Sequence, residues 1–89
     1  MGHIDPAYIE QCLGRAERGD PDALCNLGRM YCSGHGVELN LVEAHKWFNL
    51  AAARGNVQAK LYREEIAHEM SQTDVAAAQR EAREWISTH

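Results

Sequence analysis

Residues 27–37 read LGRMYCSGHGV, and the glycines in this stretch decide how the chain folds around it. Apolar residues recur at helical spacing before it, which predicts a helix that ends at Gly34, where glycine readily adopts a positive φ. Gly28 falls inside that helix, where a residue without a side chain lets a neighbouring helix approach closely. Cys32 and His35 lie three apart in the same stretch, a spacing that also suits a metal loop or a reactive thiol.

Working outward from this stretch, capping residues and glycines divide the chain into five amphipathic helices. We expect them at 6–18, from 21 to Gly34, from a cap at Asn40 to Gly55, from Asn56 onward, and from a cap at Ser71 or Thr73 onward, with Asp5 and Asp20 capping the first two. The apolar residues expected to face inward include Ile9, Cys12, Leu13 and Ala16 in the first helix, Leu61, Tyr62, Ile66 and Met70 in the fourth, and Val75, Ala78, Ala82, Trp85 and Ile86 in the fifth. No segment alternates as a strand does, so the fold class is predicted to be all-α.

Composition narrows the classes of partner. The net charge is −4 at pH 7, and acidic and basic residues are mixed along the 89 residues. Nucleic acids and anionic membranes attract clustered Lys and Arg, so we expect neither as a partner. No apolar run approaches the roughly 18 residues that cross a bilayer, and the N-terminus lacks the pattern of a secretion signal. With an odd number of cysteines, three, we expect reduced thiols and a cytoplasmic protein.

The chain also repeats itself. A shift of 36 residues places Ala16, Arg18, Gly19 and Ala23 on Ala52, Arg54, Gly55 and Ala59. A helix end, a glycine and a small inward residue therefore recur together. Repeats of this length with two helices each are typical of a helical solenoid, in which each hairpin covers the exposed face of the next.

One repeat carries a more specific pattern. Its residues are Ala23, Leu27, Gly28, Tyr31, Gly34, Gly36, Val37, Asn40, Ala44, Trp47, Phe48, Ala51, Ala52, Gly55 and Ala59. In this order and spacing they resemble the Sel-one-like repeat family, which is related to the tetratricopeptide repeat. The resemblance implies antiparallel helical hairpins stacked as a short right-handed superhelix that binds a protein or peptide, and it does not imply catalysis. The family includes bacterial secreted proteins, adaptor subunits and regulators, so the resemblance leaves the partner open.

The rest of the chain departs from the pattern. Glu64 stands at the place of Gly28 in the second copy, which also lacks the glycine loop. We therefore predict one domain over 1–89, made of a half repeat at 6–19, a complete repeat at 20–55 and a degenerate repeat at 56–89. The last helix is expected to cap the C-terminal end, with Trp85 sealing it onto the array.

The resemblance also indicates where a partner binds. In such arrays the first helix of each hairpin lines the concave surface, so its outward polar positions are the expected contacts. They are Asn26, Arg29 and Ser33 in the complete repeat and Tyr62, Arg63 and Glu69 in the second copy.

Catalysis and metal binding are the competing interpretations of the glycine loop. A structural zinc site takes more ligands than Cys32 and His35, and no other Cys or His stands at a paired spacing. Ser33 or Cys32 beside His35 could be nucleophile and base, but neither an orienting acid nor an oxyanion donor is evident. We expect no metal, no cofactor and no enzymatic activity, with a small hydrolase as the third hypothesis for function.

Two further alternatives concern the cysteines and the ends of the array. Some secreted members of the family are disulfide-linked, so one alternative is a disulfide between Cys12 and another cysteine. The other is that all three cysteines are reduced and pack as small apolar residues. So short an array leaves apolar surface at its N-terminal end, around Tyr8, Ile9 and Cys12. The second hypothesis for function is thus a self-associating homo-oligomer or a fragment of a longer solenoid.

Trp47 and Phe48 are neighbours on one helix, so we expect one inside the hairpin and the other against the next helix.

Overall fold

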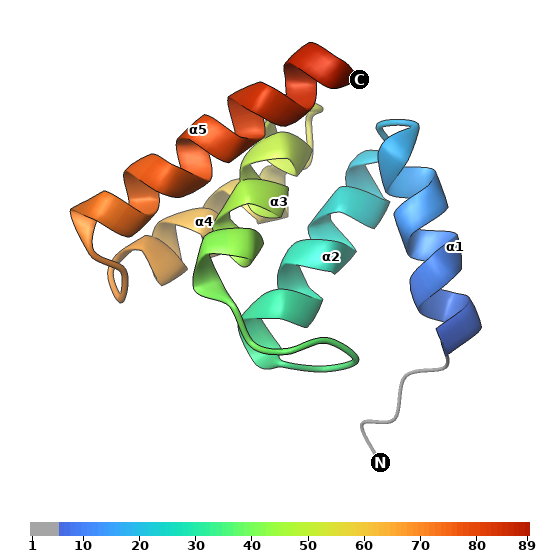
Figure 1. Ribbon diagram of the computed structural model, residues 1–89, viewed down its shortest axis with the longest axis horizontal. Coiled ribbons are helices and arrows are strands. Elements are labelled where there is room, and N and C mark those ends of the chain that lie inside the picture. Colours follow the sequence, from blue (N-terminus) through green and yellow to red (C-terminus); the bar gives the residue numbers. More distant parts are fainter. Residues whose placement is uncertain (1–5) are drawn as a thin grey trace.

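The computed structural model describes residues 6–89, and all of the regular structure in that range is helical. The helices are α1 (Pro6–Glu17), α2 (Pro21–Ser33), α3 (Leu41–Ala53), α4 (Val57–Ala67) and α5 (Gln72–Thr88), as Figure 1 shows. The all-α prediction is confirmed, with helices close to the expected positions. The expected first cap, Asp5, lies outside the described residues.

Polar side chains start the four later helices by accepting hydrogen bonds from backbone amides that have no partner within the helix. Asp20 Oδ1 accepts from Asp22 N–H at 2.9 Å, Asn40 Oδ1 from Glu43 N–H at 3.1 Å, Asn56 Oδ1 from Ala59 N–H at 2.9 Å, and Ser71 Oγ from Asp74 N–H at 3.0 Å. Of the two candidates for the last cap, the structure uses Ser71. The shift of 36 residues holds in three dimensions, because Gly19 and Gly55 both have positive φ, 85° and 100°, just before the equivalent caps Asp20 and Asn56.

Gly34 ends α2 in the predicted way. Its φ is 74° and its ψ 23°, the left-handed conformation, and its N–H donates to the carbonyl of Met30 at 2.8 Å. The N–H of His35 reaches the same carbonyl at 3.1 Å. The loop that follows returns to α2, since Asn40 N–H donates to the carbonyl of Tyr31 at 3.0 Å immediately before α3 begins. The chain therefore leaves α2 and enters α3 in a fixed direction.

The hairpin of α2 and α3 is the centre of the molecule. In Figure 1, α1 lies along one side of α2, while α4 and α5 lie on the side of α3. The last helix, α5, makes its main contacts with α3 rather than with α4. The C-terminal pair of helices is thus not a second copy of the central hairpin.

The two aromatic residues of α3 pack in opposite directions in the core. Phe48 is fully buried inside the hairpin against Gly28, where an added Cβ would lie 2.5 Å from two ring carbons. Trp47 faces the other way and meets Trp85 of α5 edge to face, with ring centroids 6.2 Å apart at 77°. The predicted division of the two aromatics is confirmed, as is the sealing position of Trp85.

Three residues expected to face inward are exposed instead: Leu13, Leu61 and Ile86. They lie on α1, α4 and α5, which flank the central hairpin and bury only part of their surface. On α4, for example, Ala59, Tyr62 and Ile66 fill the inward face and Leu61 points away from it. Met70 follows the end of α4 and is half-buried.

Candidate functional site

A cavity of about 460 Å³ runs across α2 and is bounded by α1 on one side and α4 on the other. Its lining residues are Tyr8, Asn26, Arg29, Met30, Cys32, Ser33, His35 and Tyr62. Four of the six residues predicted to contact a partner are in this set: Asn26, Arg29, Ser33 and Tyr62. The structure therefore brings most of the predicted contacts together at one place.

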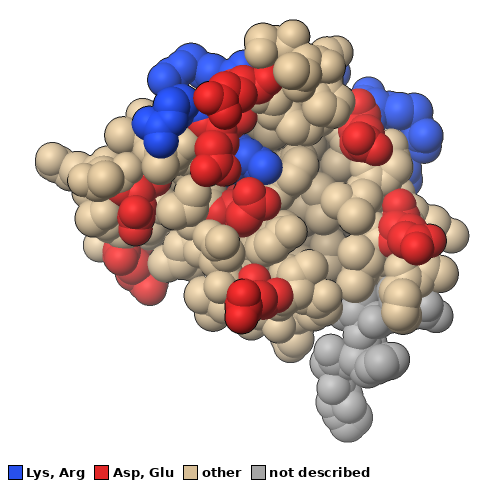
Figure 2. Space-filling model, in the orientation of Figure 1, with Lys and Arg blue, Asp and Glu red and all other residues tan. Residues whose placement is uncertain are grey.

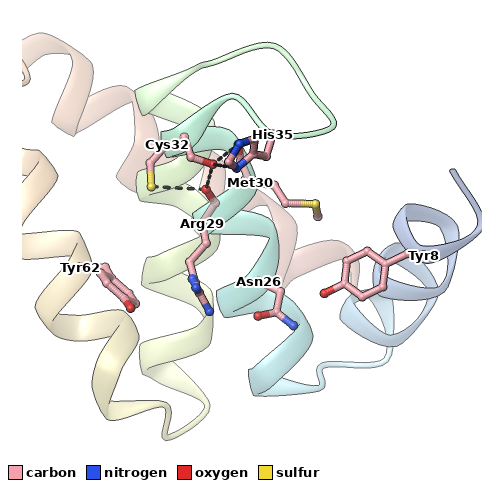
Figure 3. A pocket seen from close by; sticks show the side chains of 8 residues that line it. Tyr8, Asn26, Arg29, Met30, Cys32, His35 and Tyr62 are labelled. Atoms are coloured by element: carbon pink, nitrogen blue, oxygen red, sulfur yellow. Dashed lines mark hydrogen bonds between the residues drawn. The ribbon is translucent and has the colours of Figure 1, made fainter. Parts of the chain in front are cut away.

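The helical period of α2 explains why its residues share the cavity. Asn26, Arg29, Met30 and Ser33 are spaced by three and four positions, so they form one stripe along the helix. Met30 is only 5% exposed and supplies the apolar floor, whereas Arg29 is exposed. In Figure 3 the polar ends of Tyr62, Arg29, Asn26 and Tyr8 form a row across α2.

Two tyrosines form the walls. Tyr62 of α4 packs on the buried ring of Phe48, with centroids 5.3 Å apart at 30°, and this contact fixes its position beside the cavity. Tyr8 of α1 stands opposite and is half-exposed. Tyr8 was predicted to lie at an exposed apolar end of the array, and not among the residues that contact a partner. Met30, Cys32 and His35 were also missed as lining residues.

The other two predicted contacts lie elsewhere. Arg63 Nη1 donates to Asn49 Oδ1 of α3 at 2.7 Å, so its guanidinium is held against the hairpin. Glu69 comes two residues after the end of α4 at Ala67. Neither residue lines the cavity.

The contacts of the glycine loop limit the chemistry that its side chains can perform. Ser33 Oγ lies 3.4 Å from His35 Nδ1, but at 2.8 Å it donates to the carbonyl of Arg29. Burial raises the pKa of the Cys32 thiol, and the opposing effect of Arg29 is smaller, so the thiol form is favoured over the nucleophilic thiolate. Within residues 6–89, no three His, Cys, Asp or Glu side chains are grouped so that they could hold a metal ion. The loop thus offers no activated nucleophile.

The cysteines are free thiols, and their positions correct one expectation. Cys12 was predicted to leave apolar surface at the N-terminal end, but it is buried because α1 packs it against α2. Its Sγ–H donates to the carbonyl of Ala23 at 3.3 Å. Cys25 is buried as well, and burial raises the pKa of both thiols. Ile9 is half-buried against the core, which leaves Tyr8 as the exposed member of the predicted surface.

His45 is a buried polar residue outside the cavity. It lies on α3 with 3% of its surface exposed, and its Nδ1 has no hydrogen-bond partner among the described residues. Burial lowers the pKa of His45, and the positive charge of Arg63 lowers it further. The neutral imidazole is therefore the form that fits the core.

Charged side chains of both signs lie on the face drawn in Figure 2. The basic groups lie in the upper part of this face, whereas acidic groups are spread across it. Within the described part of the chain, no helix is long and apolar enough to cross a membrane.

Comparison with known proteins identifies the central hairpin. The model of the Sel1 repeat family matches residues 21–56, and no curated protein matches the chain. The matched segment begins with α2, contains the Gly34 turn and α3, and ends at Asn56, the N-cap of α4. It coincides within one residue at each end with the complete repeat predicted at 20–55. The hairpin of α2 and α3, whose first helix lines the cavity, is therefore similar to a Sel1 repeat.

Proposed function

We propose that this chain is a protein-interaction module that binds an extended segment of a partner protein in the cavity across α2. The Sel1 repeat is a helical repeat of the protein-interaction type, which supports the general class. The specific proposal rests on the cavity itself, where the polar side chains of Asn26, Arg29 and Ser33 lie between two tyrosines and beside the apolar Met30.

The composition of the cavity suits a peptide. Its volume of about 460 Å³ falls within the range of roughly 300–1,000 Å³ found for ligand pockets. Tyrosine and arginine are enriched among the residues that dominate binding energy at protein interfaces, and both border this cavity. The amide of Asn26 can donate to and accept from a peptide main chain. The module acts by binding alone, which agrees with the engaged Ser33 hydroxyl and the protonated Cys32 thiol.

Selection from a random peptide library on the immobilised chain tests the proposal. We expect selected peptides to bind the wild type but not Asn26→Trp, because the indole occupies the cavity without disturbing the buried face of α2. Gln79→Trp is the matched control, since Gln79 is exposed on α5 away from the cavity. Circular dichroism should show the same helical content for both variants.

Two results would contradict this function. Peptides that bind Asn26→Trp as well as the wild type would place the binding surface elsewhere. Failure to select any peptide would argue that the cavity does not bind extended chains.

A second candidate function is self-association, and the outer face of α4 favours it. Val57 and Leu61 lie one helical turn apart on that face, and both are more than half exposed. A further repeat, or a second copy of the chain, would cover such a stripe in a helical array. Sedimentation equilibrium tests this candidate, because self-association raises the mass with concentration.

A further inference from the structure

Arg29 is the only Lys or Arg among the residues that line the cavity, and it forms no ion pair there. None of the eight lining residues is a carboxylate, in a chain that has 13 Asp and Glu against nine Lys and Arg. Among the described residues, Arg15 pairs with Asp20 and Lys46 with Glu43, and no ion pair includes Arg29. The cavity thus has the charge opposite to that of the molecule as a whole.

Three other cations of the chain, Arg15, Arg63 and Lys46, are held by partners. Arg15 donates to Asp20 through two nitrogens, at 2.9 and 2.7 Å, and Arg63 donates to Asn49. Lys46 pairs with Glu43 and lies over the ring of Trp47, 4.2 Å from its centroid. Within residues 6–89, no side-chain hydrogen bond of Arg29 is recorded, and Figure 3 shows its guanidinium extended along α2 between Asn26 and Tyr62.

The donors around this guanidinium define the group that it can bind. An arginine presents its N–H groups as a planar fork that matches the two oxygens of a carboxylate. The amide of Asn26 and the phenols of Tyr8 and Tyr62 add donors on either side. The cavity therefore suits one carboxylate flanked by groups that pack on aromatic rings.

The position of Arg29 within α2 separates a side-chain carboxylate from other anions. Backbone amides often capture a C-terminal carboxylate, but the amides of Asn26, Arg29 and Met30 lie in the interior of the helix and are engaged there. A phosphoryl group carries nearly two negative charges and is usually met by a cluster of arginines, whereas this cavity supplies one. The side chain of an internal Asp or Glu is the anion that fits a single guanidinium in a cavity without free backbone N–H groups.

We infer that the partner segment presents an internal Asp or Glu side chain to Arg29, with its neighbouring residues against Tyr8 and Tyr62. This inference rests on the proposed peptide-binding function and adds the chemistry of the ligand. Recognition then depends on a single guanidinium, and that dependence can be measured.

Pools of short random peptides with blocked ends test it, each pool having Glu, Gln or Lys fixed at its centre. A fourth pool has central Gln and a free C-terminal carboxylate. We expect the immobilised chain to retain the Glu pool about tenfold more strongly than the Gln pool, the effect of a charge-assisted hydrogen bond. Arg29→Gln should remove the preference, Arg29→Glu should shift it to the Lys pool, and added salt should weaken it.

Arg80→Gln is the matched control, because Arg80 is an exposed arginine of α5 outside the cavity. It should leave the preference unchanged; a loss equal to that of Arg29→Gln would reduce the effect to overall charge and overturn the inference. If the wild type retains the Glu and Gln pools equally, and Asn26→Trp retains neither, the preference for a carboxylate is overturned. The proposed peptide-binding function would then still hold. Stronger retention of the free C-terminal pool would overturn the choice of an internal side chain. If Asn26→Trp blocks none of the pools, the proposed function itself fails.

Discussion

Gly28 and Gly14 both lie inside helices, but an added methyl group meets very different surroundings at the two positions. At Gly28 it would lie 2.5 Å from the ring of Phe48, whereas at Gly14 nothing lies within 4 Å. We expect Gly28→Ala to lower the free energy of unfolding by about 1–3 kcal/mol, because the hairpin must open to accommodate the methyl group. Gly14→Ala should raise it by about 0.5–1 kcal/mol, the gain of alanine over glycine in a helix. Urea unfolding followed by circular dichroism measures both, and equal effects would show that α2 and α3 do not approach as closely as the structure has them.

His45 gives a second prediction at the scale of one residue. Its pKa is lower in the folded protein than the value of 6.5 for a free imidazole, so below that pH the unfolded chain binds the proton more readily. Stability should be full above about pH 6.5 and should fall as the pH drops toward the folded-state pKa, by at most about 1.4 kcal/mol per pH unit. Urea unfolding between pH 7.5 and 5, values chosen to bracket this range, measures the effect.

Two variants identify the group responsible for that slope. His45→Leu should flatten it, since no proton can then bind at the buried position. His68→Gln should leave it unchanged, because His68 is exposed. Asp20 does not interfere, because its hydrogen bonds with Arg15 hold the pKa of its carboxyl below 3.8, outside the range measured. A slope that survives in His45→Leu would assign the dependence to another group.

At the scale of the element, α5 is attached through Trp85. This side chain meets Trp47 of α3 edge to face and stacks on His89 with ring centroids 3.9 Å apart. We expect Trp85→Ala to lower the free energy of unfolding by about 3 kcal/mol, the usual cost of removing a large aromatic side chain from a packed site. Ile86→Ala is the matched control, because Ile86 is the next residue of the same helix and is 57% exposed; its effect should stay within about 0.5 kcal/mol.

Limited proteolysis shows whether α5 alone is released or the whole array is loosened. In Trp85→Ala we expect cleavage to begin within 72–88, while α2 and α3 stay protected. Simultaneous cleavage throughout the chain would mean that α5 and the hairpin of α2 and α3 fold as one cooperative unit.

The positions of the helices were predictable because caps and stops are local. Asn40 and Asn56 start a helix when the side-chain oxygen accepts a hydrogen bond from the backbone N–H three residues later. Gly34 ends a helix by adopting a positive φ. The inward faces of the flanking helices were not predictable in the same way. Apolar spacing placed Leu61 and Ile86 among inward residues, but whether an apolar face is covered depends on which neighbours are present, and periodicity does not report that.

At the scale of the whole molecule, the same distinction explains the candidate site. Asn26, Arg29 and Ser33 share a face of one helix, so their spacing was sufficient to group them. Tyr8 lines the same cavity only because α1 packs beside α2. Arg63 lies outside the cavity because its guanidinium is hydrogen-bonded to Asn49 of α3. Both facts belong to tertiary packing, which the spacing of residues along one helix does not contain.

The outer face of α4 supports the last prediction, on the oligomeric state. If Val57 and Leu61 bind a second copy, sedimentation equilibrium at rising concentration should give a mass that increases from 10.0 kDa toward twice that value. Leu61→Lys should return the mass to that of the monomer, because association would then bury an unpaired ammonium group.

Leu39→Lys is the matched control for that experiment. Leu39 is 58% exposed and Leu61 57%, but Leu39 lies in the loop between α2 and α3 rather than on α4. It should associate as the wild type does, since the same change in charge and apolar area is made away from the stripe. A monomeric wild type at every concentration would remove self-association and leave peptide binding in the α2 cavity as the function to test. Equal loss in both variants would show that association depends on general apolar exposure and not on α4.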